Sequence, residues 1–238
     1  MSRLLCASVA VVAAWAGLAA VARADVCAAP FMHDGGHVRL TGSGAMQLGA
    51  DVHFSEVGKS AAGACRARVQ GTASFGLAGL PPGKSKIDYW MSVRNGYAHF
   101  ERRDDSGRRV PLNGGFDLRM LGLFAYGQPI THAGQTFAAL KFQVHVDRQA
   151  QPLTVRTGEK TVGQRQRIQT ARGPQSCWPV RYERVTDPTQ ASFNGLVLPI
   201  PGMRAAVTDW YCPALHMVMK QDSNQQGLAS ELEVATLE

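Results

Sequence analysis

Apolar and polar side chains alternate along much of this chain, and successive side chains of a β-strand point to opposite faces of its sheet. The alternation is clearest in residues 46–55, with apolar side chains at Met46, Leu48, Ala50, Val52 and Phe54. It returns in residues 66–75, where Gly71 takes one of the apolar positions. We expect a half-buried strand in each segment, with a bend or bulge at Gly71.

Turn sequences separate the alternating segments. Asn95-Gly96 is a strong signal for a tight hairpin turn, and residues 87–94 and 97–103 flank it as the two predicted strands. Residues 104–107 supply a second turn, before a short return strand at 110–112. The segment 79–83 contains two prolines between glycines and is predicted to be a loop.

The second half of the chain continues the strand pattern. We expect strands at residues 140–147, 178–183, 198–200, 205–211, 215–220 and 228–237. In the predicted strand at 205–211, one face carries Ala205, Val207, Asp209 and Tyr211. Pro213 follows it, and because proline has no amide hydrogen it should end that strand.

Three segments of this half depart from simple alternation. Residues 116–126 are apolar but irregular, and they are the one place where we expect a short helix. Residues 156–172 are rich in Arg, Gln and Thr, which is typical either of a solvated strand pair or of a mobile loop. Residues 222–227 are predicted to form a loop.

These segments amount to roughly ten strands joined mostly by short turns. The predicted fold is therefore all-β, an antiparallel meander that forms a barrel or half-barrel, with at most one short helix. We expect a single β-rich domain over residues 25–238. A division into two domains near Gly127 is the alternative, and only a weak change of composition favours it.

The first residues carry an export pattern. Arg3 precedes an alanine- and valine-rich run from Leu4 to Val21, which ends in the small-x-small site at 22–24. This order predicts a signal peptide over residues 1–24 that is cleaved before Asp25. The alternative is an uncleaved membrane anchor, because the run approaches the roughly 20 residues that a spanning helix needs. After cleavage we expect a periplasmic or secreted chain that does not span the membrane.

The net charge of the chain bears on which partners it can bind. The full chain has 25 Lys and Arg against 18 Asp and Glu, and the signal removes Arg3 and Arg23 but no acid. The small positive net charge that remains is common among proteins and needs no explanation beyond solubility. We therefore expect no nucleic-acid partner, since no recognition motif accompanies this charge.

Four cysteines remain after cleavage: Cys27, Cys65, Cys177 and Cys212. An even set in an exported chain predicts two disulfides. Cys177 and Cys212 each lie 17 residues from Asn194-Gly195, so a chain that folds back at this turn would bring them opposite each other. This symmetry favours Cys177 with Cys212 and Cys27 with Cys65, and the other two connectivities stay open.

Two segments carry a family resemblance. Residues 134–142 resemble a "Gly-x-Phe-x-x-x-Lys/Arg-Val" strand, and residues 210–216 resemble a closing "Trp-Tyr-x-Pro-Glu-Leu-Gly" turn, both from exported bacterial β-protein families of unknown function. The chain departs from that pattern at Ala214 and His216, and the first half shows no match. Those families resemble in turn the half-barrels of periplasmic lipoprotein carriers, which implies by analogy an apolar cavity.

Basic and aromatic residues are the candidates for binding. Arg165, Arg167 and Arg172 form the predicted anion-binding group, because guanidinium forks suit phosphate and carboxylate. Solvated hairpin arginines are the alternative, here and at residues 102–109. One residue of each pair Tyr89-Trp90 and Trp210-Tyr211 should lie in the core, since neighbours on a strand point to opposite faces.

The sequence predicts no catalytic residue, metal site or cofactor. The segment His33-Asp34-Gly35-Gly36-His37 holds two imidazoles and a carboxylate, the ligands of a transition metal, yet its glycines favour an exposed polar loop. The chain lacks a nucleophile elbow, a zinc-protease helix and a phosphate-binding loop.

These observations favour a non-catalytic exported protein that binds a lipid or other amphipathic or apolar small molecule, or an envelope protein partner. Two alternatives stay open. The first is an exported hydrolase of envelope glycan or ester bonds, whose catalytic carboxylates could lie far apart in the sequence. The second is a structural subunit of an envelope assembly.

Overall fold

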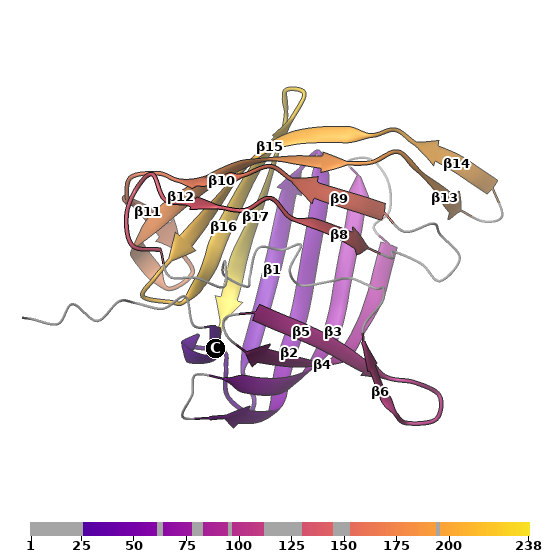
Figure 1. Cartoon of the computed structure of the whole chain (residues 1–238), viewed down its shortest axis with the longest axis vertical. Coiled ribbons are helices and arrows are strands. Elements are labelled where there is room, and N and C mark those ends of the chain that lie inside the picture. The colour runs from indigo at the N-terminus through magenta and orange to yellow at the C-terminus, as the bar shows by residue number, and fades with distance from the viewer. Residues whose placement is uncertain are drawn as a thin grey trace, which may run out of the picture.

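The computed structural model describes residues 26–60, 64–77, 83–94, 97–111, 130–144, 153–193 and 196–238. This part of the chain is almost entirely β, with one sheet of 15 strands, a separate ladder of two strands, and the short 3₁₀ helix η1 (Val26–Ala28). Every strand pair is antiparallel, from the β1–β17 ladder to the β8–β9 ladder. The sheet is open, with β6 and β7 at the two ends of its strand order (Figure 1). The predicted all-β antiparallel fold is confirmed, with more strands than expected.

The first half of the chain forms a simple meander, in which each strand pairs with the next in sequence. Its strands are β1 (His37–Gly44), β2 (Met46–Lys59), β3 (Cys65–Leu77), β4 (Gly83–Arg94), β5 (Tyr97–Arg103) and β6 (Arg109–Pro111). The predicted hairpin strands around residues 95–96 are β4 and β5, with Arg94 paired to Tyr97.

The last strand joins the two halves. β17 (Leu228–Leu237) pairs with β1 on one side and with β16 (Met217–Gln225) on the other, and Figure 1 shows it in the middle of the sheet. The order continues through β15 (Met203–Cys212), β12 (Gly173–Thr186), β10 (Lys160–Val162) and β7 (Thr136–Phe137). Shorter strands complete it: β8 (Lys141–Val144), β9 (Leu153–Thr157) and β11 (Gln166–Thr170).

A long hairpin explains the second disulfide. β12 pairs with β15, and beyond them β13 (Thr189–Phe193) pairs with β14 (Leu196–Ile200). All partners in both ladders are placed symmetrically about Asn194-Gly195, for example Trp178 with Tyr211 and Phe193 with Leu196. The same symmetry sets Cys177 opposite Cys212. The disulfides are Cys177–Cys212 and Cys27–Cys65, as predicted.

Alternation gives the sheet two unlike faces. We call the face that carries Val52, Phe54, Val180 and Asp209 the inner face, because these four residues are buried. On β2 the intervening residues, such as Asp51 and His53, lie on the outer face and are half-buried or exposed. On β12 and β15 both faces are covered near the second disulfide, where Cys177 and Cys212 are buried. Tyr89 and Tyr211 are the core members of the two aromatic pairs, and Trp90 and Trp210 lie on the outer face.

Gly71 occupies an inner position of β3 for a steric reason. It lies opposite Val52, and a Cβ built on it would stand only 1.9 Å from the carbonyl oxygen of Asp51. Only glycine allows β2 and β3 to approach so closely here.

Several other predictions can now be compared with the structure. Residues 153–170 contain three short strands rather than a loop. They are not simply solvated, because Val155 and Thr157 of β9 and Lys160 and Val162 of β10 are buried. The predicted loop at 222–227 is wrong in extent, because β16 continues to Gln225 and only a tight turn at Gln226 and Gly227 remains. The signal at 1–24 and the helix at 116–126 lie outside the described residues. Within the described ranges, no helix has the length and hydropathy to cross a membrane.

Candidate ligand-binding face

Charged and polar side chains are buried on the inner face where β10, β12, β15 and β16 lie side by side. Asp209 on β15 is 1% exposed, Gln221 on β16 is 4% exposed and Lys160 on β10 is 8% exposed. Asp209 and Gln221 are direct cross-strand partners. Tyr182 and Arg184 of β12 share their face and are half-buried. We call these five residues the Lys160–Asp209 cluster.

Hydrogen bonds connect the cluster. The Gln221 side-chain amide donates to Asp209 Oδ1 over 2.7 Å, and the Tyr182 hydroxyl donates to the same oxygen over 3.4 Å. Arg184 donates to Gln221 Oε1 over 3.3 Å, which fixes the orientation of that amide. The Lys160 ammonium lies 4.6 Å from the centre of the Tyr182 ring. The Asp209 carboxylate therefore interacts electrostatically with Lys160, and Arg184 is linked to it through Gln221.

Burial changes the protonation chemistry of two members. Loss of solvent lowers the pKa of Lys160, and the charge of Asp209 opposes that shift. Burial also raises the pKa of Tyr182 well above its ordinary value, and the neighbouring Asp209 carboxylate adds to the effect. Tyr182 is thus a neutral hydrogen-bond donor at neutral pH.

An apolar cluster adjoins these polar groups. Its buried members come from β7, β10, β12, β15, β16 and the segment before β7: Ile130, Phe137, Val162, Trp178, Val180, Tyr211 and Val218. The Trp178 indole nitrogen is buried in it and finds no acceptor among the described residues. Val162 and Lys160 belong to the same short strand, so the apolar and the charged surfaces are continuous.

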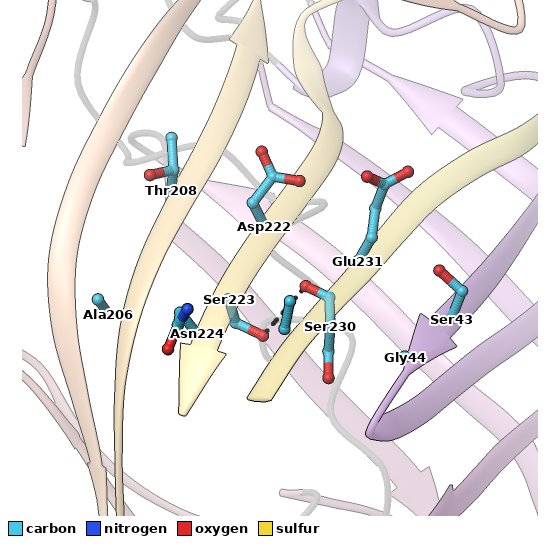
Figure 2. A pocket seen from close by; sticks show the side chains of 10 residues that line it. Ser43, Gly44, Ala206, Thr208, Asp222, Ser223, Asn224, Ser230 and Glu231 are labelled. Carbon is cyan, nitrogen blue, oxygen red and sulfur yellow. Dashed lines mark hydrogen bonds between the residues drawn. The ribbon is translucent and has the colours of Figure 1, made fainter. Parts of the chain in front are cut away.

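A shallow open groove lies elsewhere, along β15, β16, β17 and the end of β1. It encloses about 530 Å³ and is lined mainly by small and hydroxyl side chains, together with Asp222 and Glu231 (Figure 2). These carboxylates are direct cross-strand partners. Lys220 forms an ion pair with each, and the Trp210 indole donates to Asp222 over 2.7 Å.

The groove carboxylates are therefore held by their neighbours. Partial burial alone would lower the pKa of Lys220, but the hydrogen bond to Glu231 and the charges of the two adjacent acids raise it overall. Lys220 therefore keeps its positive charge beside them. A catalytic carboxylate pair needs one member that is protonated near neutral pH. Here both carboxylates are instead engaged in ion pairs with Lys220.

The three predicted anion-binding arginines lie on and beside β11 and make different contacts. Arg165 stacks over Trp178 at 4.6 Å, at the border of the apolar cluster. Arg167 pairs with Ser176 in the β11–β12 ladder, and Arg172 donates to the Leu237 carbonyl oxygen over 3.3 Å. All three are exposed. A shared anion site formed by the three stays a prediction.

Sequence reasoning missed the Lys160–Asp209 cluster, although one signal for it was visible. Asp209 occupies a position in residues 205–211 where the alternation calls for an apolar side chain. A carboxylate buried at such a position needs a charged or hydrogen-bonding partner. Lys160 had no comparable signal, because β10 is three residues long and shows no readable period.

Comparisons with known proteins support the fold but do not identify a family. No family model matches the sequence, and no curated protein matches it significantly. The structure is similar to an exported protein with a YmcC-like fold from Bacteroides fragilis, with a TM-score of 0.50, 11% identity, and coverage of 86% of this chain and 96% of the other. It is also similar to a lipoprotein from Parabacteroides distasonis, with a TM-score of 0.51, 12% identity, and coverage of 88% and 98%.

The similarity covers nearly the whole of both solved proteins, so this chain shares their overall fold. The resemblance of its second half to exported β-proteins agrees with that finding at the level of the fold. The Trp-Tyr-x-Pro turn itself stays a prediction. Two disulfides fit a periplasmic or secreted location, where thiols are oxidised.

Proposed function

We propose that this chain is an exported, non-catalytic binding protein whose ligand is an amphipathic molecule with an anionic end. The ligand lies on the inner face, with its apolar part on the Ile130–Val218 apolar cluster and its anionic end at the Lys160–Asp209 cluster. The observation that carries the proposal is the burial of Lys160 and Asp209 directly beside that apolar surface.

The energetic cost of this arrangement is the first support. A charged group taken out of water loses several kcal/mol of solvation, and apolar residues of similar volume often stabilise a protein as well or better. Two cations and one carboxylate on the inner face are thus a costly way to build a core. A role in recognising an anion accounts for that cost, since buried cations bind anions strongly at low dielectric.

Accessibility and donor geometry are the second support. Tyr182 and Arg184 are only half-buried, so a ligand can reach the cluster from solvent. The Trp178 indole donor, which has no acceptor in the part of the chain that the structure describes, lies within the apolar cluster. A carboxylate, phosphate or ester oxygen of a ligand would satisfy it, and a purely apolar ligand would not.

Hydrolysis is less well supported by the same groups. Asp222 and Glu231 are fixed by Lys220 and Trp210, and Asp209 accepts hydrogen bonds from Gln221 and Tyr182. None of these contacts pairs a nucleophile with a general base.

The test uses native mass spectrometry of the purified chain, followed by titration with a dansyl-labelled fatty acid. We expect copurified amphiphile or uptake of the probe, and at least tenfold weaker probe binding for Lys160→Met. Lys86→Met is the matched control, because Lys86 is 81% exposed and lies outside the cluster. This variant should bind the probe as tightly as the wild type does. Absence of both bound amphiphile and probe uptake would refute the proposal.

A further inference from the structure

We propose that His37, Asp51 and His53 form a binding site for a transition-metal dication on the outer face of the sheet. The three side chains come from the two neighbouring strands β1 and β2. Their ligand atoms all lie within 4.8 Å of one another. The site is independent of the inner-face ligand and rests on different residues.

The strand register brings these residues together. His37 and His53 are direct cross-strand partners, and Asp51 precedes His53 by two residues, so all three project from the outer face. The imidazole rings are stacked, with centroids 4.3 Å apart and an angle of 9° between the planes. Backbone hydrogen bonds of 2.9 Å in both directions between His37 and Glu238 anchor this end of β1 to the chain after β17.

One carboxylate oxygen lies at the centre of the group. Asp51 Oδ1 is 2.8 Å from His37 Nε2 and 3.7 Å from His53 Nε2. Ligands about 2.1 Å from a tetrahedral zinc ion stand about 3.4 Å apart, so the first separation must widen and the second must shorten slightly. The rings must also tilt out of parallel so that both nitrogens face one ion. Side-chain rotations are sufficient, since His53 is 63% exposed and Asp51 47%.

The chemistry of the ligands selects the class of metal. Two imidazoles and one carboxylate suit Zn²⁺, Cu²⁺ or Ni²⁺ rather than Mg²⁺ or Ca²⁺, which prefer oxygen ligands. Three protein ligands leave a fourth position for water. The Asp51 carboxylate also adds negative charge to the site, which favours binding of a dication.

Glu238 acts as a positioning residue for His37. Its Oε2 lies 3.9 Å from His37 Nδ1, on the side of the ring opposite the Nε2 that contacts Asp51. A carboxylate behind a ligating histidine favours the tautomer with the proton on Nδ1 and leaves Nε2 free to bind metal.

The loop histidine considered from sequence takes no part. His33 Nδ1 contacts the Asp34 carbonyl oxygen at 2.9 Å, and Asp34 Oδ1 accepts the Val57 amide. Of the segment 33–37, only His37 belongs to the site, and its partners come from β2. The sequence could not have indicated this grouping without the β1–β2 register.

Isothermal titration with ZnCl₂ tests the site, on untagged protein with its disulfides intact. We expect one Zn²⁺ per chain with a micromolar or lower Kd. His53→Ala and Asp51→Asn should each weaken binding at least tenfold, and Glu238→Gln should weaken it severalfold. His33→Ala and His99→Ala are matched controls, because both residues are exposed histidines outside the site, and both variants should bind as the wild type does.

A second measurement separates loss of the site from loss of the fold. In EDTA the wild type, His53→Ala and Asp51→Asn should unfold at the same temperature, and added Zn²⁺ should raise that temperature only in the wild type. The proposal is overturned if the wild type binds no Zn²⁺ at millimolar concentration. It is equally overturned if the control variants lose as much affinity as His53→Ala, which would indicate unspecific surface binding.

Discussion

The inner and outer faces of the same strands hold charged residues under opposite conditions. Asp209 and Gln221 are paired on the inner face and are almost fully buried, whereas Trp210 and Lys220, one step along the same ladder, lie on the outer face. Ion pairs in contact with water contribute at most about 1 kcal/mol, while a buried charge costs several kcal/mol if its partner is lost. The charges that need a functional explanation are therefore the inner ones.

The largest expected effect comes from breaking the inner cluster. Asp209→Ala leaves the buried Lys160 without its carboxylate and removes the acceptor of Gln221 and Tyr182, and it should lower the free energy of unfolding by about 3–5 kcal/mol. Urea denaturation measures the loss. Asp222→Ala, on the outer face of the neighbouring strand and 42% exposed, should cost about 1 kcal/mol or less. Equal losses for the two variants would contradict the contrast between the faces.

Neighbouring residues of β4 test the contrast without charge. Met91 is fully buried on the inner face, and Met91→Ala should cost about 2–5 kcal/mol through the cavity it leaves. Trp90 lies on the outer face beneath the Arg109 guanidinium, 4.2 Å from the ring centre. Trp90→Ala should cost about 1 kcal/mol. The comparison fails if the outer substitution is the more damaging in thermal or urea unfolding.

A smaller loss of stability is expected at Gly71, where β3 lies close to the backbone of β2. Gly71→Ala places a methyl group against the Asp51 carbonyl and should destabilise the fold by about 1–3 kcal/mol. Gly158→Ala is the control, since its new Cβ would have no atom closer than 3.8 Å. A neutral Gly71→Ala, measured by the same unfolding assay, would mean that β2 and β3 are farther apart than described.

The smallest effect concerns pH. The folded protein holds the proton of Tyr182 to a higher pH than the unfolded chain, so this residue contributes stability that is lost as pH rises above about 10. Absorbance at 295 nm should show a late-titrating tyrosine in the wild type that is missing in Tyr182→Phe. If the tyrosine that is missing from the variant titrates near pH 10 in the wild type, Tyr182 is not buried beside Asp209.

The sequence predicted the architecture well because the sheet is built from alternating strands. The strand at 46–55 and the final strand at 228–237 were visible from period two alone, and Asn194-Gly195 indicated the register that sets Cys177 opposite Cys212. The pairing of β17 with β1 was invisible, since it joins the two ends of the domain. The inner cluster depends on the registers of β10, β12, β15 and β16, and the metal site on the register of β1 with β2, so the alternation within single strands could not reveal either grouping.

The most direct test of the proposed function compares an anionic and a neutral ligand of equal chain length. Affinity for a dansyl-labelled fatty acid and for the corresponding alcohol should differ in the wild type, with the acid bound at least tenfold more tightly. Lys160→Met should remove that preference and leave the affinity for the alcohol unchanged. If the wild type binds the two ligands equally, or if Lys160→Met weakens both alike, Lys160 does not recognise an anionic end.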